Sequence, residues 1–287
     1  MTSELTAADL RLPPGPVDLA SIDSGATPGF EGAGKKDGKG ALLALGDDLS
    51  DLQERLYAEG AADVGHARAV LLVLQGMDTS GKGGTLRHTV GLVDPQGVRI
   101  SSFKKPTDEE LEHDFLWRIR KALPAKGTIG VFDRSHYEDV LVVRVHQLVP
   151  AEEVERRYDA INAFEAEVAG AGIAMIKCML HISPETQRER LLARLDDPTK
   201  HWKFNPGDID ERSHWAAYRE AYQIALERTN TEVAPWYVVP SDHKWYRNLA
   251  IGKLLHETLT RMNPQWPAAD FDVEEQRQRL LHEVPIT

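Results

Sequence analysis

The residues that could carry chemistry begin in a glycine-rich loop directly after an apolar run. The run Ala69 to Leu74 is typical of a fully buried strand, and Gly76, Gly81 and Lys82 then match the phosphate-loop (Walker A) spacing GxxxxGK. The glycines let successive backbone N–H groups point at one place, where the next helix adds its dipole and Lys82 adds a charge. The alternative, a glycine-rich turn that binds nothing, fits the strand, the spacing and the lysine less well. We therefore expect a polyphosphate group to bind at the loop residues Gly76, Met77, Thr79, Ser80, Gly81, Gly83 and Gly84.

Two positions in this loop depart from the usual phosphate-loop pattern. The Ser or Thr that normally follows the lysine and ligates Mg²⁺ is Gly83, and a carboxylate, Asp78, lies inside the loop. A carboxylate repels a bound phosphate unless a divalent cation bridges the two or the carboxylate orients an attacking oxygen. The loop is therefore expected to serve a task other than that of an ordinary phosphate loop.

A second acidic position ends another apolar run further along the chain. Asp133 lies downstream of the phosphate loop in the Walker B arrangement, and we expect it to ligate a metal. The planar guanidinium of Arg134 can bind two phosphate oxygens at once. The alternative role for Arg134 is a structural ion pair with Glu138 or Asp139. His136 has no partners at metal-ligand spacing, so we expect it to be a packed or hydrogen-bonding histidine.

Basic residues gather at two further places. Lys104 and Lys105 follow an apolar stretch, and in open α/β sheets ligands bind at the carboxyl ends of strands. These two lysines are candidates for binding phosphates, and the alternative is that they lie in a solvent-exposed turn and bind nothing.

The segment Thr199 to Ile209, TKHWKFNPGDI, interleaves basic residues with Trp202 and Phe204. It is either a lid that stacks on a base and holds phosphates or a basic helix-loop packed by its aromatic side chains.

The composition excludes several classes of protein. The chain has 287 residues, of which 41% are apolar and 28% charged, enough for one large α/β domain. Its net charge of −11 argues against general affinity for nucleic acid or membrane surfaces, so a polyanion must be held by a local basic cluster and metal ions. The single cysteine, Cys178, cannot form an internal disulfide, and no run approaches the ~18 apolar residues of a membrane span or resembles a signal peptide. We expect a cytoplasmic protein without a membrane partner.

The remaining pattern alternates strands and helices around the loop. Apolar runs predict strands at 69–74, 98–103, 127–132, 173–182 and 236–239. Amphipathic spacing, caps and glycines predict helices at 40–60, 82–93, 107–123, 151–169, 184–195, 210–228 and 242–262. This alternation predicts a parallel sheet of about five strands covered by helices on both sides.

The two ends of the chain are expected to lie outside the main domain. Residues 1–39, rich in Pro, Gly and Ser, are predicted to be a flexible arm or a belt over the domain surface. Lys35, Lys36 and Lys39 could touch a ligand, with plain solvation as the alternative. Residues 40–264 are predicted to form the phosphate-loop domain, with a lid at about 184–215, and residues 265–287 a charged peripheral tail.

Four separated motifs together resemble the polyphosphate kinase 2 family. They are GMDTSGKGG at Gly76 to Gly84, SFKKPT at Ser102 to Thr107, FDRSHYEDVLVVRV at Phe132 to Val145, and KHWKF at Lys200 to Phe204. Their order, spacing and residue identity agree over residues from about 42 to 262, so the resemblance covers most of the chain.

The resemblance implies a fold, a reaction and a set of roles. The fold would be that of a phosphate-loop kinase, a three-layer α/β/α sandwich with a helical lid. The reaction would move a phosphoryl group between inorganic polyphosphate and a nucleotide, with Mg²⁺ or a substituting Mn²⁺ and no covalent enzyme intermediate. The YEDVLVVRV run looks most like the subgroup acting on both nucleoside mono- and diphosphates, here AMP and ADP or GMP and GDP. The resemblance implies that Asp78 and Asp133 are catalytic acids that bind metal. It implies that Lys82 is the cation of the loop and that Arg134 clamps a phosphate. It also implies that Arg194 and Lys200 are cations of the lid, and that the polyphosphate channel is lined by Lys104, Lys105 and Arg118. We also expect a homo-oligomer, a dimer or a tetramer.

The chemistry of the residues agrees with this reaction. Phosphoryl transfer has a loose transition state and needs positioning and charge neutralisation more than acid–base catalysis. The terminal phosphate of a nucleotide has a second pKa of about 6 and is largely ionised near neutral pH, so Asp78 need not abstract a proton. Its expected role is to hold Mg²⁺ between donor and acceptor oxygens.

Two rival functions use the same residues. An ordinary ATP-dependent kinase for a nucleotide or small molecule would fit the loop, Asp133 and the arginine-rich lid, but Asp78 and Gly83 argue against it. A non-catalytic module that senses polyphosphate or nucleotides is disfavoured because both acids, the loop lysine and a lid are all present.

Overall fold

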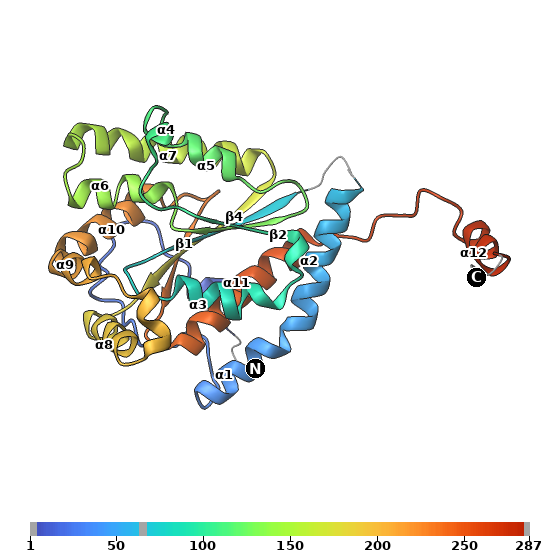
Figure 1. Ribbon diagram of the computed structural model, residues 1–287, viewed down its shortest axis with the longest axis horizontal. Helices are drawn as coiled ribbons and strands as arrows, with labels where there is room; N and C mark the ends of the chain where they lie inside the picture. The colour runs from blue at the N-terminus through green and yellow to red at the C-terminus, as the bar shows by residue number, and fades with distance from the viewer. Residues whose placement is uncertain (1–4, 63–67, 284–287) are drawn as a thin grey trace.

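The protein is built on a five-stranded parallel sheet with helices on both faces (Figure 1). In this computed structural model the structure describes residues 5–62 and 68–283. The strand order is β2-β3-β1-β4-β5, and every pairing within the sheet is parallel. The α/β fold with a parallel sheet, predicted from the alternating pattern, is confirmed. The strands are β1 (Ala69–Gln75), β2 (Val98–Ser102), β3 (Ile129–Asp133), β4 (Ile173–His181) and β5 (Trp236–Pro240).

Alternate side chains of the central strand face two separate hydrophobic layers. Leu71 and Val73 of β1 are fully buried in one core, against helices that include α5, α7 and α10. Val70, Leu72 and Leu74 are buried in the other core, against α2 and α11. A strand covered on both faces must be apolar at every position, which is why β1 reads as a continuous apolar run. The helices are α1 (Lys35–Ala44), α2 (Gly46–Ala61), α3 (Lys82–His88), α4 (Asp108–Leu111), α5 (Trp117–Ala122), α6 (Val142–Val145), α7 (Ala151–Gly170), α8 (Pro184–Leu195), α9 (Gly207–Ser213), α10 (Trp215–Thr229), α11 (Lys244–Met262) and α12 (Val273–Leu281).

Two predicted helices are each interrupted by a side-chain hydrogen bond to the backbone. The capping box of Thr107 and Glu110 opens α4 as expected, but the helix predicted for 107–123 stops at Leu111. Asp114 Oδ1 then accepts from the Leu116 amide at 2.9 Å and begins a separate helix, α5. The helix predicted for 210–228 is likewise divided into α9 and α10 near Ser213, whose hydroxyl donates to the Asp210 carbonyl oxygen at 2.6 Å. Such local bonds compete with helix hydrogen bonds.

The helix before β1 begins earlier than the leucine spacing predicts. The structure has two helices, α1 and α2, that meet at Leu45, and α1 starts at Lys35 instead of Gly40. Gly38 explains the position of α1, because a Cβ atom there would overlap the ring of Trp245 on α11. The glycine therefore allows α1 to lie directly on α11. The helix predicted for 82–93 is also shorter, since α3 ends at His88 and a 3₁₀ turn follows.

The N-terminal segment lies along the outer edge of β5. The Leu12 amide donates to the Trp236 carbonyl oxygen at 2.9 Å, and the Val238 amide donates to the Leu10 carbonyl oxygen at 3.0 Å. These two bonds make the segment a short antiparallel neighbour of β5 around Arg11. The apolar side chains that hold it down, all buried, are Leu5, Leu10, Leu12, Val17 and Leu19.

At the other end of the chain, α12 stands away from the rest of the molecule on an extended stretch (Figure 1). Leu280 and Leu281 on α12 are both 71% exposed, which agrees with its position beyond the domain. Within residues 5–62 and 68–283, none of the helices is both long enough and apolar enough to cross a membrane.

Candidate active site

The loop between β1 and α3 has the backbone conformation that a phosphate cradle requires. Gly76 and Gly81 have positive φ values of 150° and 114°, and Thr79 has a φ of 64°. A left-handed conformation at a residue other than glycine costs roughly 1 kcal/mol or more and is concentrated at functional sites. Lys82 Nζ donates to the Gly76 carbonyl oxygen at 2.9 Å, so the lysine spans the loop from end to end.

Two arginines from distant helices fix the loop from behind. Arg190 on α8 donates from Nη1 to the carbonyl oxygens of Thr79 at 2.9 Å and Ser80 at 3.2 Å. Arg247 on α11 donates from Nη1 to the Ser80 carbonyl oxygen at 3.1 Å, and a Cβ atom on Gly81 would overlap its guanidinium. Burial, together with the charge of Arg190, lowers the pKa of Arg247 to about 9. The sequence predicted the helices that carry Arg190 and Arg247 but contained no signal for their contacts with the loop.

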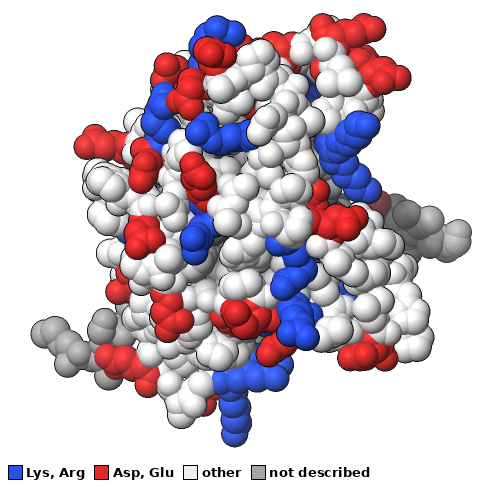
Figure 2. Space-filling model, turned by 90° about the vertical axis from the view of Figure 1, so that its left-hand side faces the viewer, with Lys and Arg blue, Asp and Glu red and all other residues white. Residues whose placement is uncertain are grey.

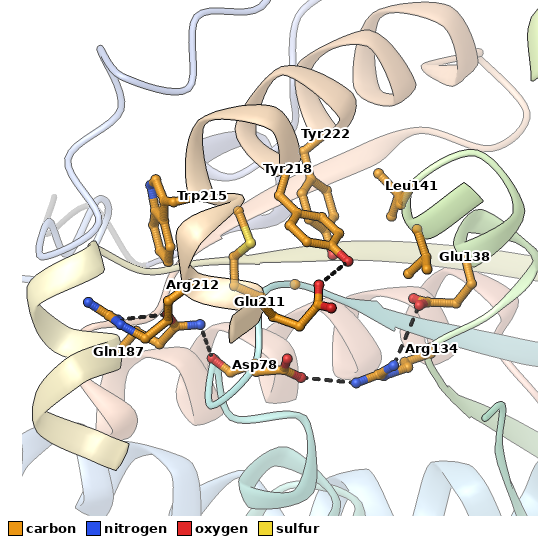
Figure 3. A pocket seen from close by; sticks show the side chains of 13 residues that line it. Asp78, Arg134, Glu138, Leu141, Gln187, Glu211, Arg212, Trp215, Tyr218 and Tyr222 are labelled. Atoms are coloured by element: carbon orange, nitrogen blue, oxygen red, sulfur yellow. Dashed lines mark hydrogen bonds and ion pairs between the residues drawn. The ribbon is translucent and has the colours of Figure 1, made fainter. Parts of the chain in front are cut away.

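The acid inside the loop is paired with the residue after the Walker B acid. Arg134 Nη2 donates to Asp78 Oδ1 at 2.9 Å, and Arg134 Nη1 lies 3.6 Å from Glu138 Oε2 (Figure 3). Burial disfavours the charge on Arg134, but the carboxylates of Glu138 and Asp78 outweigh it and raise its pKa. Arg134 has a φ of 65°, a second left-handed residue at the site. The ion pair with Glu138, which was the alternative to phosphate binding, is present, and the contact with Asp78 was not anticipated.

Asp133 and Lys82 lie at the same end of neighbouring strands. Asp133 is the last residue of β3 and is in register with Leu74 of β1, just before the loop. Burial and then the charge of Arg134 lower the pKa of Lys82, whereas the carboxylates of Asp78 and Asp133 raise it. The two acids predicted to bind metal thus act on one lysine, so the fold brings Asp78, Asp133 and Lys82 together as the motifs predict.

Above Asp78 lies a small cavity that the sequence did not predict. Gln187 on α8 donates to the Asp78 carbonyl oxygen at 2.9 Å, and Arg212 on α9 donates to Gln187 Oε1 at 2.8 Å. Tyr218 on α10 donates to Glu211 Oε2 at 2.6 Å across the top (Figure 3). The cavity has a volume of about 50 Å³, room for a few water molecules. Its walls also include Trp215 and Tyr222, to which the sequence assigned no role.

The two cations predicted for the lid are bound within the segment that was predicted to form it. Arg194 Nη1 donates to the Lys203 carbonyl oxygen at 3.0 Å and lies 3.3 Å from Asp208 Oδ2. Lys200 Nζ lies 2.7 Å from Asp197 Oδ2. The structure therefore does not place these two cations on the phosphate loop.

The aromatic residue of the lid does not pack into the protein. Trp202 is 79% exposed, and the Lys203 ammonium lies 4.8 Å from the centre of its ring. For Trp202 this exposure disagrees with the alternative in which the aromatic residues pack the segment, whereas Phe204 is half-buried.

The residues predicted for the polyphosphate channel lie apart from the loop. Lys104 and Lys105 are exposed beyond the end of β2, an edge strand. Arg118 is only 8% exposed, and it donates to the Lys104 carbonyl oxygen at 2.9 Å and lies 3.4 Å from Glu110 Oε2. Arg118 thus fastens the turn that carries the two lysines. Its place in the channel stays a prediction.

The turn after Arg134 is anchored on a fully buried polar network. His136 Nε2 lies 3.2 Å from Glu165 Oε1, which agrees with the expected hydrogen-bonding histidine. Lys177 Nζ donates to Glu165 Oε2 at 2.6 Å and to the Tyr137 hydroxyl at 2.9 Å. A buried charge must be paired and hydrogen-bonded, and this one is. The network holds the backbone next to Arg134 in place, and its only signal in the sequence is a lysine inside the apolar run of β4.

The acids of the site suit a hard divalent cation. Within the described ranges no group of three or more His, Cys, Asp or Glu side chains is arranged to hold a metal ion. Magnesium is commonly bound by one or two carboxylates, with water and substrate phosphates as the other ligands. The oxygen donors of Asp78 and Asp133 beside a phosphate cradle fit this kind of site, whereas a zinc site built from protein ligands alone does not fit.

Comparison with known proteins agrees with the geometry. The family model described as polyphosphate kinase 2 matches residues 33–267. A protein from Meiothermus ruber named AMP/ADP-polyphosphate phosphotransferase is 47% identical over 255 residues, which are 89% of this chain and 93% of that protein. An ADP-polyphosphate phosphotransferase from Rhodopseudomonas palustris is 41% identical over 249 residues, which are 81% of this chain and 84% of that one. The crystal structure of polyphosphate kinase 2 from Arthrobacter aurescens TC1 superimposes with a TM-score of 0.93 at 50% identity and covers 99% of both chains.

Proposed function

This chain belongs to the polyphosphate kinase 2 family, and on that premise we propose that it transfers a phosphoryl group between inorganic polyphosphate and either AMP or ADP. Transfer between polyphosphate and a nucleotide follows from the family. The choice of AMP and ADP is supported by the names of the relatives from Meiothermus ruber and Rhodopseudomonas palustris.

The observation that carries the proposal is the carboxylate inside the phosphate loop. Asp78 is held at 2.9 Å by Arg134 from the turn after β3, so the acid of the loop is in contact with a cation that can bind phosphate. When phosphate oxygens arrive, the Arg134 guanidinium can bind them in a bidentate manner, and Asp78 is then released to a metal ion. Together with Gly83, this acid argues against an ordinary ATP-dependent kinase.

We assign the divalent metal to Asp78 and Asp133 and identify it as Mg²⁺, for which Mn²⁺ can substitute. When bound, the ion neutralises phosphate charge as the bond between phosphorus and oxygen changes partners. Because Gly83 replaces the usual hydroxyl ligand, we assign the metal to these two acids of the motifs.

The protein's own residues supply position and charge. Lys82 and Arg134 bind phosphate oxygens, and the backbone amides of the loop point at the same group. The loop keeps its shape because Arg190 and Arg247 hold its carbonyl oxygens. Since the acceptor phosphate is largely ionised near neutral pH, direct in-line transfer requires no general base.

The acceptor nucleotide is assigned to the cavity above Asp78 and to a larger cavity beside it. The second cavity, of about 320 Å³, shares Met77 and Trp215 with the first and also has apolar walls from Ile22 and Met179. An apolar cavity with an aromatic side chain suits a nucleobase. Because the first cavity holds about 50 Å³, we expect it to widen when a nucleotide phosphate binds.

The test is a matrix of donors and acceptors. Long-chain polyphosphate and ATP are offered separately as donors to AMP, ADP and GDP, and the nucleotide products are quantified. We expect product from polyphosphate with AMP and with ADP. Turnover with ATP alone as donor would establish the rival kinase, and tight binding of both ligands without turnover would establish the sensing module.

A homo-oligomer and a cytoplasmic location stay predictions. The oligomeric state is measured by light scattering on the purified full chain, for which we expect a dimer or a tetramer. The location is measured by cell fractionation.

A further inference from the structure

The last part of the chain forms an arm that leaves the domain at a fixed point. This C-terminal arm comprises residues 264–283, an extended stretch followed by α12 (Figure 1). Pro264 is buried at its root, and the Gln265 amide donates at 2.8 Å to Glu59 Oε1 near the end of α2. Pro267 restricts the backbone a little further along. The start of the arm is therefore fixed to the domain, and α12 is carried beyond the domain surface.

Local signals in the sequence specify α12 as a helix. Asp272 Oδ1 accepts from the Glu275 amide at 2.9 Å and caps the first turn. Gln278 Nε2 donates to Glu274 Oε1 one turn away at 2.7 Å. The helix has nine residues, however, and an isolated helix in water needs roughly 12–15 because most helix stability in proteins comes from packing of an apolar face. We therefore expect α12 to pack on a surface.

One face of the arm is apolar and uncovered. Leu280 and Leu281 follow Val273 by seven and eight residues, a spacing that places all three on one side of α12. These three side chains are more than half exposed, as are those of Trp266 and Phe271 on the extended stretch. Within the part of the chain that the structure describes, the domain thus leaves the apolar face of its own arm open.

The size of this apolar face indicates which partner can cover it. From typical side-chain areas, the exposed parts of the five apolar side chains amount to about 400 Å². A stable interface buries about 800 Å² on each partner. One arm lying on an unrelated protein would supply about half of that area. Two arms exchanged between two copies supply all of it, because each copy buries its own arm and also the surface that receives the other arm.

The charge of the arm argues against two other classes of occupant. The arm contains five acidic and two basic residues, which gives a net charge of −3. Amphipathic helices that lie on membranes carry Lys and Arg on their polar face, and nucleic acids are bound through positive charge. The arm lacks the positive charge that either surface requires.

The receiving surface is expected on the side of the partner from which its own arm leaves. Figure 2 shows the face turned away from the arm, where basic and acidic side chains are interspersed from the top to the lower end. An apolar helix face gains little there, because the polar groups that it covers lose water without gaining a partner. Two arms that exchange about a two-fold axis also have to leave the two copies close to one another.

We propose that the C-terminal arm holds two copies of this chain together, with α12 of each copy packed on the domain of the other. Leu280 and Leu281 form the centre of the contact, and Trp266 and Phe271 cover the passage between the two domains. The inference concerns assembly and is independent of the proposed reaction. A dimer satisfies it, and so does a tetramer built from two such dimers.

The first test replaces the apolar face of α12 in the full chain. In Leu280→Glu/Leu281→Glu we expect the dissociation constant of the dimer to rise at least ~10²-fold, because each lost apolar contact occurs twice in a two-fold assembly. Light scattering over a dilution series should show the wild type as a dimer or tetramer and this variant at half that mass or less. Circular dichroism should show both folded, since α12 lies outside the domain.

The matched control adds the same charge to the same end of the helix. Gln278→Glu/His282→Glu places two negative charges at exposed positions away from the apolar face, and it should keep the wild-type mass. A loss of mass equal to that of the leucine variant would show that charge alone separates the copies, and it would overturn the proposal.

A cross-link identifies the occupant directly. Cys178 is the single cysteine and is fully buried, so a thiol introduced by Gln276→Cys, one turn before Leu280, can be labelled alone with a photoreactive group. Irradiation should give a covalent dimer, and peptide mapping should join α12 of one copy to the domain of the other.

Three further results would overturn the proposal. The first is a wild type that is monomeric at every concentration, whether its arm packs on its own domain or on another protein. The second is an unchanged mass for Leu280→Glu/Leu281→Glu. The third is a set of cross-links confined to single chains.

Discussion

Arg134 and Asp78 come from loops after two different strands, yet their side chains meet at 2.9 Å. The contact joins the phosphate loop after β1 to the Walker B turn after β3, so each element sets the position of the other. It also means that the charge of Asp78 is balanced by Arg134 when no phosphate is present. In the proposed reaction an entering phosphate would exchange partners with Asp78, which would couple substrate binding to the exposure of the proposed metal ligand.

Loss of either acid should stop catalysis and leave the fold intact. We expect Asp78→Asn and Asp133→Asn each to lower kcat by at least ~10²-fold, because each removes a negative charge from the metal site and no volume from the core. Steady-state kinetics at saturating Mg²⁺ and circular dichroism provide the measurement. A variant with near-normal kcat would show that its acid is not part of the site.

Removal of divalent cations should abolish turnover without unfolding the protein. The described residues contain no cluster that binds metal through protein ligands alone, so the ion is not expected to stabilise the fold as a structural metal does. Activity should vanish in a chelator and return with Mg²⁺ or Mn²⁺. The melting temperature of the ligand-free protein should be the same in both buffers, and a large decrease in the chelator would point to a structural metal.

Gly81 and Gly83 should respond very differently to alanine. A side chain at Gly81 meets the Arg247 guanidinium and also has to adopt a φ of 114°, so Gly81→Ala should lose roughly 2 kcal/mol of stability. At about 2–4 °C per kcal/mol this corresponds to a fall of about 4–8 °C in melting temperature.

Gly83 is the matched control for this substitution. It lies in the first turn of α3 with no atom near the position of a Cβ, so Gly83→Ala should not lower the melting temperature. Equal melting temperatures for the two variants would mean that Arg247 does not fix the loop.

The lid cations should matter for kinetics more than for stability. Arg194 joins two parts of the lid through Lys203 and Asp208, and Lys200 is an exposed residue paired with Asp197. We expect Arg194→Ala and Lys200→Ala to impair kcat and nucleotide affinity, by about tenfold or more for Arg194→Ala, because the lid would close in a different shape.

The melting temperature of both lid variants should be nearly unchanged. Arg188→Ala, which removes an exposed arginine from the same helix as Arg194, is the control. Normal kinetics combined with a large decrease in melting temperature would assign Arg194 to packing alone.

Much of the fold follows from patterns that are local in the sequence. The five strands were predicted because each is a short apolar run bounded by turn residues, and α8 because Ser183 caps its first turn. The breaks near Leu45 and Ser213 were missed because no proline marks them. They depend on packing and on single hydrogen bonds that spacing does not reveal.

The candidate site likewise contains residues that local sequence patterns predict and residues that they do not. Asp78, Lys82 and Asp133 belong to motifs with fixed spacing, so the sequence identifies them. Arg190 and Arg247 are separated from the loop by more than a hundred residues and contact only its carbonyl oxygens, which any sequence supplies. No pattern of residue types in the sequence predicts such a contact. The same holds for Gln187 and Tyr218, whose role in closing the cavity depends on how α8 and α10 pack.

The N-terminal segment beside β5 has a consequence for aggregation. An uncovered strand at the edge of a sheet offers a row of unpaired backbone groups to any other chain. Leu10 and Leu12 already bond to the outer side of β5, so foreign strands cannot add there without displacing them. At the opposite edge, β2 has only five residues. A truncation that removes the first 20 residues would uncover β5, and the resulting protein should form ordered aggregates more readily than the full chain.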